Sequence, residues 1–109
     1  MGRNRRLRLK DKIREKTRRT CGQSLARIID ALNPILRGWF GYFKHASRNT
    51  FVRLDKFISR RLRAILRKQE KRPGLGLAWA DHLRWPNAYF ANAGLFALHI
   101  AWQHARYSR

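Results

Sequence analysis

The chain has 109 residues, of which 44% are hydrophobic, 26 are lysine or arginine and six are acidic, so its formal net charge is +20 at pH 7. This length leaves room for one domain or two small helical lobes on a shared core, and it excludes a polymerase or another large enzyme. An ordinary small domain needs a net charge of only about 2 to 8 for solubility, and self-repulsion at a much higher charge opposes compaction unless a polyanion neutralises it. Arginine predominates among the basic residues, and its planar group suits phosphates and stacks on bases, so the composition favours a nucleic-acid partner.

The cysteine count and the hydropathy pattern bear on the compartment. Cys21 is the only cysteine, so no disulfide can form within the chain, and a reduced compartment is the simple interpretation. No stretch approaches the roughly 20 apolar residues that span a bilayer, and Asp11 and Glu15 interrupt the basic start, which argues against an organelle-targeting helix. We therefore expect a cytoplasmic protein that associates with nucleic acid and not with a membrane.

Two helices are predicted before residue 33. Ten of the seventeen residues in the range 3–19 are basic, and a narrow contact stripe with a spacing of four allows a helix there: Leu9, Ile13 and Thr17. Such a helix is marginal without a partner. Ser24 is a candidate N-cap for the second helix, whose apolar residues have the 0, 3, 4, 7 spacing of a helix that faces a core: Leu25, Ile28, Ile29 and Leu32.

Asn33 and Pro34 predict the start of a third helix. Asparagine is a common cap, and proline is favoured at the first helical position, where its missing N–H costs nothing. The apolar residues that follow repeat the same spacing: Leu36, Trp39, Phe40 and Phe43. Gly38 and Gly41 lie on a neighbouring strip, although each glycine costs up to about 1 kcal/mol relative to alanine in a helix. We expect a close approach to these glycines, by another helix in preference to an RNA backbone.

The longest predicted helix follows Thr50, a candidate N-cap. Its apolar stripe has spacings of 3, 4, 4 and 3 and indicates a core face: Phe51, Leu54, Ile58, Leu62 and Ile65. Basic residues recur on other faces and predict a continuous cationic ridge roughly 27 Å long at 1.5 Å per residue: Arg53, Lys56, Arg60, Arg63, Arg67 and Lys71. Asp55 and Glu70 are the acidic residues of this helix, and so little charge balance favours phosphate contact over an ordinary solvated face.

The remaining residues predict a connector and a short helical tail. Arg72 to Gly76 ends the long helix, the Trp85-Pro86-Asn87 sequence starts a further helical segment, and Gly94 ends that segment before a last helix over 95–106. We find no convincing strand. The sequence therefore predicts an all-α fold, with a bundle of three to four helices over residues 1–72, a Pro/Gly linker over 73–80 and a helical appendage over 81–109.

Catalytic and metal-binding patterns are not recognisable. A two-metal site needs clustered carboxylates, whereas the six acidic residues are scattered singly: Asp11, Glu15, Asp30, Asp55, Glu70 and Asp81. His99 and His104 are five residues apart, about 140° around a helix, and one cysteine cannot complete a thiolate zinc site. We expect a protein that is not an enzyme and that uses no metal, cofactor or small-molecule substrate.

A resemblance to a known family covers about residues 7–105. The string LNPILRGWFGYF at residues 32–43 and the RRLRAILR run at residues 60–67 resemble the maturase-specific domain of group II intron reverse transcriptases. The string RWPNAYFANAGLFAL at residues 84–98 is similar to the C-terminus of bacterial members. In that family the region, also called domain X, is a helical thumb that binds intron RNA and helps it fold for splicing and mobility.

The resemblance implies a partner and a set of contacts. Group II intron RNA would be the polyanion, and a separately encoded reverse transcriptase chain is a second expected partner. The predicted RNA-binding residues are Arg5, Arg6, Arg8, Lys10, Arg14, Arg18, Arg19, Arg37, Lys44, Arg53, Lys56, Arg60, Arg63, Arg67 and Lys71. Three aromatic residues beside basic or loop segments are candidates for base stacking: Tyr42, Trp79 and Trp85.

The sequence also departs from the family pattern. The polymerase with its catalytic aspartates does not precede the domain, and the paired-cysteine endonuclease module does not follow it, so we expect neither reverse transcription nor DNA cleavage. The main expectation is a maturase domain that stabilises folded intron RNA. The alternatives are a non-catalytic module that complements a separate reverse transcriptase, a general DNA- or RNA-binding architectural protein, a gene remnant, and a cationic membrane binder.

Overall fold

The structure is a computed structural model that describes residues 2–18, 23–43, 47–70 and 79–107, without the side chains of residues 2–7, 43, 79 and 106–107. The described residues form six α-helices and no strand: α1 (Gly2–Lys16), α2 (Leu25–Phe43), α3 (Arg48–Gln69), α4 (Trp79–Arg84), α5 (Asn87–Asn92) and α6 (Leu98–Tyr107). The all-α prediction is confirmed. The basic N-terminal helix and the helical segment that follows the Trp85-Pro86-Asn87 sequence form as expected, whereas the short helix α4 before that sequence was not predicted.

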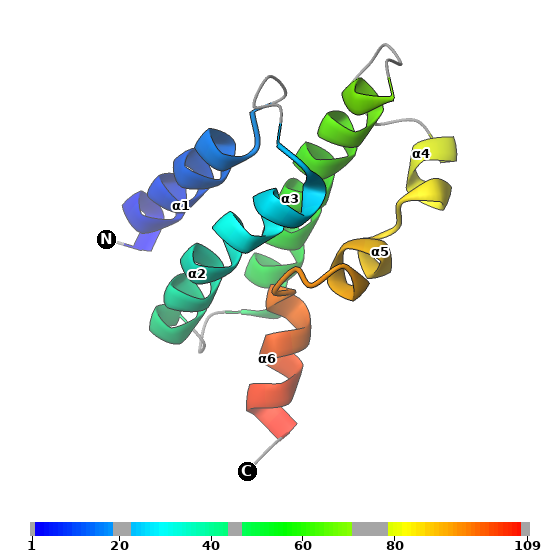
Figure 1. The fold of residues 1–109 in the computed structure, drawn as a ribbon. Helices are drawn as coiled ribbons and strands as arrows, with labels where there is room; N and C mark the ends of the chain where they lie inside the picture. The colour runs from blue at the N-terminus through cyan, green and yellow to red at the C-terminus, as the bar shows by residue number, and fades with distance from the viewer. Residues whose placement is uncertain (1, 19–22, 44–46, 71–78, 108–109) are drawn as a thin grey trace.

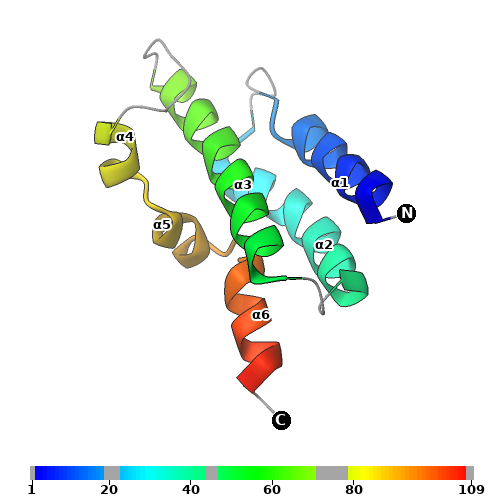
Figure 2. The same cartoon turned by 180° about the vertical axis from the view of Figure 1, so that it is seen from behind.

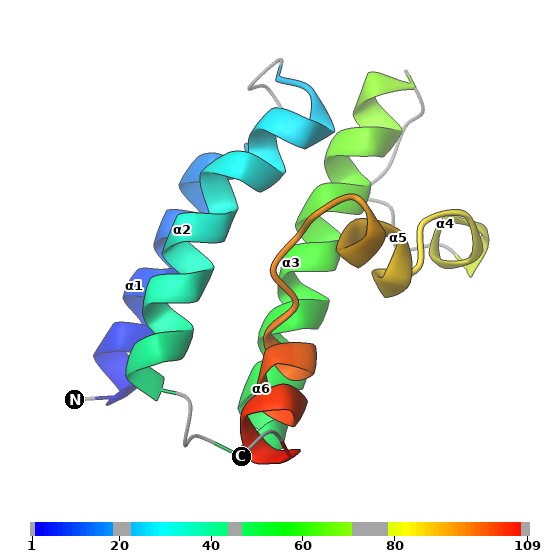
Figure 3. The same ribbon diagram turned by 60° about the horizontal axis from the view of Figure 1, so that its bottom comes forward.

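The long helix α3 lies at the centre of the arrangement (Figures 1 and 2). The hairpin of α1 and α2 covers one side of α3, and α4 and α5 lie on the other side, as Figure 3 shows most clearly. Helix α6 packs against the N-terminal half of α3, where its first residues contact Asp55. Helix α3 therefore packs against the α1–α2 hairpin, the α4–α5 segment and α6.

The predicted apolar stripes form the core. Leu9 and Ile13 of α1 and the whole predicted stripe of α3 are buried, so these contact faces are confirmed. The rings of Trp39 and Phe51 meet edge to face with centroids 5.8 Å apart, which joins α2 to α3. Phe90 and Leu98 belong to the same buried cluster, so α5 and α6 share the core of α1 to α3. The predicted division of the chain into a bundle over 1–72, a linker over 73–80 and an appendage over 81–109 stays a prediction.

The prediction of a helix break at Asn33-Pro34 is wrong, because α2 continues through Pro34. Its buried residues keep the helical spacing on both sides of the proline: Ile28, Leu32, Leu36 and Trp39. Asn33 is not a cap but a tertiary contact. Its amide nitrogen donates to the Gly94 carbonyl at 2.8 Å, and its amide oxygen accepts from the Phe96 N–H at 2.8 Å. Burial of a continuous stripe therefore outweighs the local cost of the proline.

Two further helix starts differ from the predictions. The N-cap of α3 is Ser47, so Thr50 lies within the first turn, where its N–H donates to the Ser47 carbonyl. The last helix begins at Leu98 and not at Leu95. Gly94 ends α5 with a φ of 107°, a conformation that favours glycine, while the Leu95 N–H donates to the Phe90 carbonyl at 3.0 Å. This turn and the Asn33 contacts hold residues 94–96 outside a helix.

A carboxylate of α3 caps the start of α6. The Asp55 oxygens accept from the Leu98 N–H at 3.0 Å and from the His99 N–H at 2.9 Å. Burial raises the pKa of Asp55, and these two hydrogen bonds partly counteract the rise. A helix N-terminus normally receives its cap from the preceding residues, whereas α6 receives it from a residue 43 positions earlier. The cap therefore fixes the C-terminal helix to α3.

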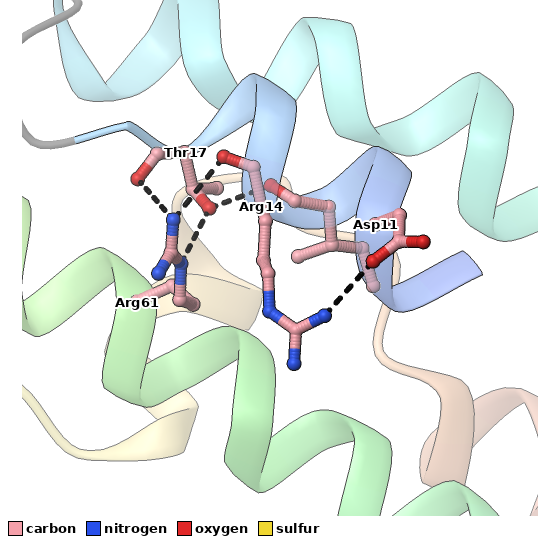
Figure 4. Close-up of polar contacts among 5 residues, drawn as sticks. Asp11, Arg14, Thr17 and Arg61 are labelled. Carbon is pink, nitrogen blue, oxygen red and sulfur yellow. Dashed lines mark hydrogen bonds and ion pairs between the residues drawn. The ribbon is translucent and has the colours of Figure 1, made fainter. Parts of the chain in front are cut away.

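An arginine of α3 holds the end of α1 (Figure 4). Arg61 donates from Nε to the Thr17 hydroxyl at 3.0 Å and from a terminal nitrogen to the Arg14 carbonyl at 3.1 Å. The Thr17 hydroxyl donates in turn to the Ile13 carbonyl at 2.6 Å. A cation at a helix C-terminus satisfies carbonyls that have no partner within the helix and interacts favourably with the helix dipole. Arg61 thereby positions the basic helix α1.

We predict that Pro34→Ala stabilises the protein by up to about 3 kcal/mol, because alanine restores an N–H inside a continuous helix. The free energy of unfolding from urea titration measures the change. Pro86→Ala is the matched control, since Pro86 precedes the first residue of α5 and its replacement should not raise stability. An unchanged unfolding free energy for Pro34→Ala would contradict a continuous α2.

We also predict that Asp55→Ala lowers the free energy of unfolding by about 1 to 2 kcal/mol, because the start of α6 loses both side-chain hydrogen bonds. Asp30→Ala is the control, since Asp30 is exposed on α2 and its replacement should change stability by less than about 0.5 kcal/mol. Equal effects of the two substitutions on urea denaturation would show that Asp55 is not a cap.

Candidate nucleic-acid interface

The structure divides the predicted cationic ridge of α3 into two parts. Arg53, Lys56 and Arg60 are exposed along the N-terminal and central turns. Arg63 is only 4% exposed, and Arg67 is half-buried. The division follows the contacts with the α4–α5 segment, which lies beside α3 (Figure 3) and whose residues bind Arg63 and Arg67. The five residues therefore lie in one row, but they do not share one environment.

Arg63 makes its contacts inside the protein. Its Nε donates to the Trp85 carbonyl at 2.7 Å, and a terminal nitrogen donates to the Asn87 side-chain oxygen at 3.0 Å. Its guanidinium also lies 5.8 Å from the centroid of the Phe90 ring. Burial lowers the pKa of Arg63, the neighbouring Arg60 lowers it further and Asp81 opposes both, but an arginine stays charged in a protein. An RNA contact by Arg63 stays a prediction, and it would require these bonds to break.

Two ion pairs hold α4 beside α3. Arg67 binds the buried Asp81 carboxylate at 2.6 Å. Arg84 binds the two oxygens of Glu70 at 2.6 Å and 2.5 Å, and its guanidinium lies 4.7 Å from the centroid of the Trp85 ring. Bidentate arginine–carboxylate pairs have a fixed geometry. These pairs, together with the Arg63 contacts, set the position of the segment that faces the exposed part of the ridge.

A basic groove of about 550 Å³ opens between α3 and the α4–α5 segment. Lys56 and Arg60 line it from α3, with Arg63 beside them, and His82 and Asn87 line it from the opposite side. None of the described residues that line the groove is acidic. Cations that converge without a carboxylate produce a positive potential, which the low-dielectric walls of a groove strengthen. The groove therefore suits an extended polyanion such as a phosphate backbone, and Lys56 and Arg60 are the exposed cations that would contact it.

A second groove, of about 390 Å³, lies between α1 and α2. Arg8 and Lys12 line it from α1, and Gly38 and Tyr42 line it from α2. A Cβ atom added to Gly38 or Gly41 would meet nothing within 4 Å in the described structure. The expectation that another helix packs closely against these glycines is therefore wrong. The approach of an RNA backbone to them stays a prediction.

The other described basic residues of the predicted set lie on two surfaces. Lys10 and Arg14 of α1 lie over the Phe57 ring of α3, each 5.3 Å from its centroid. Arg14 also pairs with Asp11 at 3.0 Å, as Figure 4 shows. Arg18 is exposed after α1. Arg37 of α2 lies apart from them, over the Phe96 ring at 5.6 Å. Their contacts with RNA stay predictions.

The two described candidates for base stacking differ in exposure. Tyr42 is 67% exposed on α2. Trp85 is 5% exposed and packs in the core, so stacking on it would require α4 and α5 to move. The remaining predicted residues lie outside the described main chain or have side chains that are not described: Arg5, Arg6, Arg19, Lys44, Lys71 and Trp79.

Sequence reasoning missed four residues that shape these surfaces. Lys12 lines the α1–α2 groove. Its position one helical turn after Arg8 could have predicted that the two residues share a helix face. Arg61, next to the ridge, carries no signal that distinguishes it from its neighbours. His82 and Asn87 reach the basic groove from separate short helices, so nothing local in the sequence marks them.

The described residues contain no group of three or more histidine, cysteine or carboxylate side chains that could hold a metal ion. His99 accepts a hydrogen bond from Arg48 at 3.1 Å and stacks on Trp102 with ring centroids 6.2 Å apart. Cys21 lies outside the described residues. No described helix combines the length and the apolar character that crossing a bilayer requires.

A comparison with protein-family models matches residues 6–85 to the family described as "Group II intron, maturase-specific domain". The matched range contains most of α1, all of α2, α3 and α4, and the ion pairs that join α3 to α4. Comparisons with curated proteins and with solved structures gave no significant match.

We predict that Arg63→Gln lowers the free energy of unfolding by about 1 to 3 kcal/mol, because the buried Trp85 carbonyl loses its charged donor. Arg60→Gln removes the same charge one turn earlier from an exposed position and should change stability by less than about 0.5 kcal/mol. Urea denaturation followed by circular dichroism measures both variants. A neutral Arg63→Gln variant would show that Arg63 does not hold the α4–α5 segment.

Proposed function

The chain belongs to the family of group II intron maturase-specific domains, which gives it a role related to the splicing of these introns, and we propose that it binds group II intron RNA and stabilises the folded form of that RNA. In this proposal the intron, which is a ribozyme, performs the splicing chemistry, and the protein catalyses no reaction. The observation that carries the RNA contact is the basic groove between α3 and the α4–α5 segment.

The charge distribution supports a phosphate ligand in this groove. The protein has a formal net charge of +20, and four of its six acidic residues are engaged in ion pairs or in the cap of α6: Asp11, Asp55, Glu70 and Asp81. Carboxylates that bind arginines of the fold are less available to neutralise the exposed cations. Arg53, Lys56 and Arg60 therefore present their charge to a partner outside the protein.

Binding would draw its free energy from counterion release. A folded RNA brings phosphates of different helices close together, and each cation that replaces condensed counterions contributes to affinity. Lys56 and Arg60 inside the groove would contact one stretch of backbone, and Arg53 would extend the contact along α3. The basic helix α1, on the other side of α3, would meet a second RNA segment. A protein that contacts two segments at once stabilises the compact arrangement of the RNA.

The same surface also fits two of the alternatives. A separately encoded reverse transcriptase chain could dock on this domain, and duplex DNA could bind the groove through the same phosphates. Competition between intron RNA, an unrelated structured RNA and duplex DNA of equal length at one salt concentration distinguishes the specific function from general polyanion binding. Selective retention of the intron RNA supports a maturase role, and equal retention of all three contradicts it.

We predict that the triple variant Arg53→Gln, Lys56→Gln, Arg60→Gln binds intron RNA more weakly and with a smaller dependence on salt. Each lost phosphate contact should flatten the slope of log affinity against log salt concentration by roughly 0.7 to 0.9, so the triple variant should lose about 2 to 3 in slope. Filter binding over a series of salt concentrations measures both quantities.

The matched control for this variant is Arg27→Gln, Arg48→Gln, Lys68→Gln. It removes the same number of charges from exposed positions that do not line the groove. Both triple variants should keep the wild-type circular dichroism spectrum. If the two variants lose the same affinity and slope, the groove has no special role, and binding is a general effect of net charge.

A further inference from the structure

The groove between α1 and α2 differs in chemistry from the basic groove on α3. Its walls are mainly apolar, with Leu9 from α1 and Pro34 and Ile35 from α2. Leu9 is buried and belongs to the core, so this part of the wall is fixed by packing. Its volume of about 390 Å³ lies near the lower end of the range of small-ligand pockets, about 300 to 1,000 Å³. The groove therefore suits a flat apolar group better than a row of phosphates.

Gly38 keeps this groove open. It lines the groove from the middle of α2, and a Cβ atom placed on it would meet no neighbour within 4 Å. Glycine in a helix interior costs up to about 1 kcal/mol relative to alanine. No close contact within the described protein accounts for this cost, whereas a side chain at position 38 would enter the groove.

Aromatic and cationic groups surround the opening. Tyr42 is 67% exposed and lines the groove one turn after Gly38. Arg8 and Lys12 are exposed on the opposite helix, and the described lining includes no acidic residue. A base has an apolar face that stacks on aromatic rings, and its sugar carries phosphates on both sides. This combination of an apolar slot, an exposed ring and two flanking cations matches the chemistry of one nucleotide.

We propose that the α1–α2 groove takes up an unpaired base of the RNA, with the base against Gly38 and the Tyr42 ring and its flanking phosphates at Arg8 and Lys12. The inference rests on the proposed function, because that function supplies RNA as the partner. It adds a division of roles: the basic groove on α3 binds backbone without regard to sequence, whereas the α1–α2 groove distinguishes unpaired from paired nucleotides. RNA recognition commonly uses unstacked bases of loops and bulges in this way.

The test blocks the groove without changing charge. Gly38→Leu places a side chain in the groove, and Gly41→Leu makes the same change three residues later, where a Cβ atom also meets nothing but the residue does not line the groove. Both changes raise helix propensity, so both variants should fold, and thermal denaturation checks this. Each full-length variant is titrated with a stem-loop RNA that has unpaired bases and with a blunt RNA duplex of the same number of phosphates.

We expect Gly38→Leu to weaken binding of the stem-loop by at least about 5-fold, since one base–aromatic stack contributes roughly 5- to 150-fold. Its binding of the duplex should not change, and Gly41→Leu should keep the wild-type ratio of stem-loop affinity to duplex affinity. Tyr42→Leu should reproduce the selective loss. With 4-thiouridine in the loop, ultraviolet light should attach the RNA to the tryptic peptide that begins at Gly38 in the wild type but not in the Gly38→Leu variant.

The outcomes separate this inference from the proposed function. Equal stem-loop affinity of the two glycine variants, with wild-type RNA binding intact, would overturn the base pocket and leave the proposed function standing. Attachment of the thiouridine elsewhere on the protein would also overturn the base pocket, and an apolar segment of a protein partner would then become the better candidate for the groove. Failure of the wild type to bind either RNA would overturn both.

Discussion

The position of the C-terminal helices α4 to α6 depends first on the buried Arg63, which acts together with the two ion pairs that hold α4. Arg63 joins α3 to the Trp85 carbonyl and to Asn87 at the start of α5. Its charge is tolerated in a buried position because two oxygens accept its hydrogen bonds and Phe90 lies beside it. Once α5 is fixed, the turn at Gly94 and the Asp55 cap determine where α6 begins.

The same contacts create the surface that we assign to RNA. Without α4 and α5, the cations of α3 would lie on an open helix face. The two short helices turn this face into a groove that is lined from two sides. Arginine therefore has two roles in one row of α3. Arg60 can face a partner while Arg63, one turn later, holds the opposite wall. In a protein with so high a net charge, internal carboxylates and carbonyls give some of the arginines partners within the fold, as Asp81 does for Arg67.

The basic groove and the α1–α2 groove differ in how far the sequence could predict them. The basic groove was partly predictable, because the spacing of Arg53, Lys56 and Arg60 placed them on one face of a helix. Its other wall was not, since His82 and Asn87 lie on helices of six residues each, whose packing no local pattern determines. In the α1–α2 groove, Gly38 stood out by its helical cost, but the sequence could not distinguish a packed helix from open space.

The sequence by itself determined the helical class, the buried stripes of α1 and α3, the helical segment after Pro86 and its end at Gly94. These features follow from the periodicity and backbone preferences of neighbouring residues, which act locally. Tertiary structure decided the continuity of α2 through Pro34, the start of α6 and the separate environments of Arg60 and Arg63. In each case the local signal was ambiguous, because proline, asparagine or arginine suits two conformations or environments. The choice between them depended on burial and on hydrogen-bond partners more than twenty residues away in the sequence.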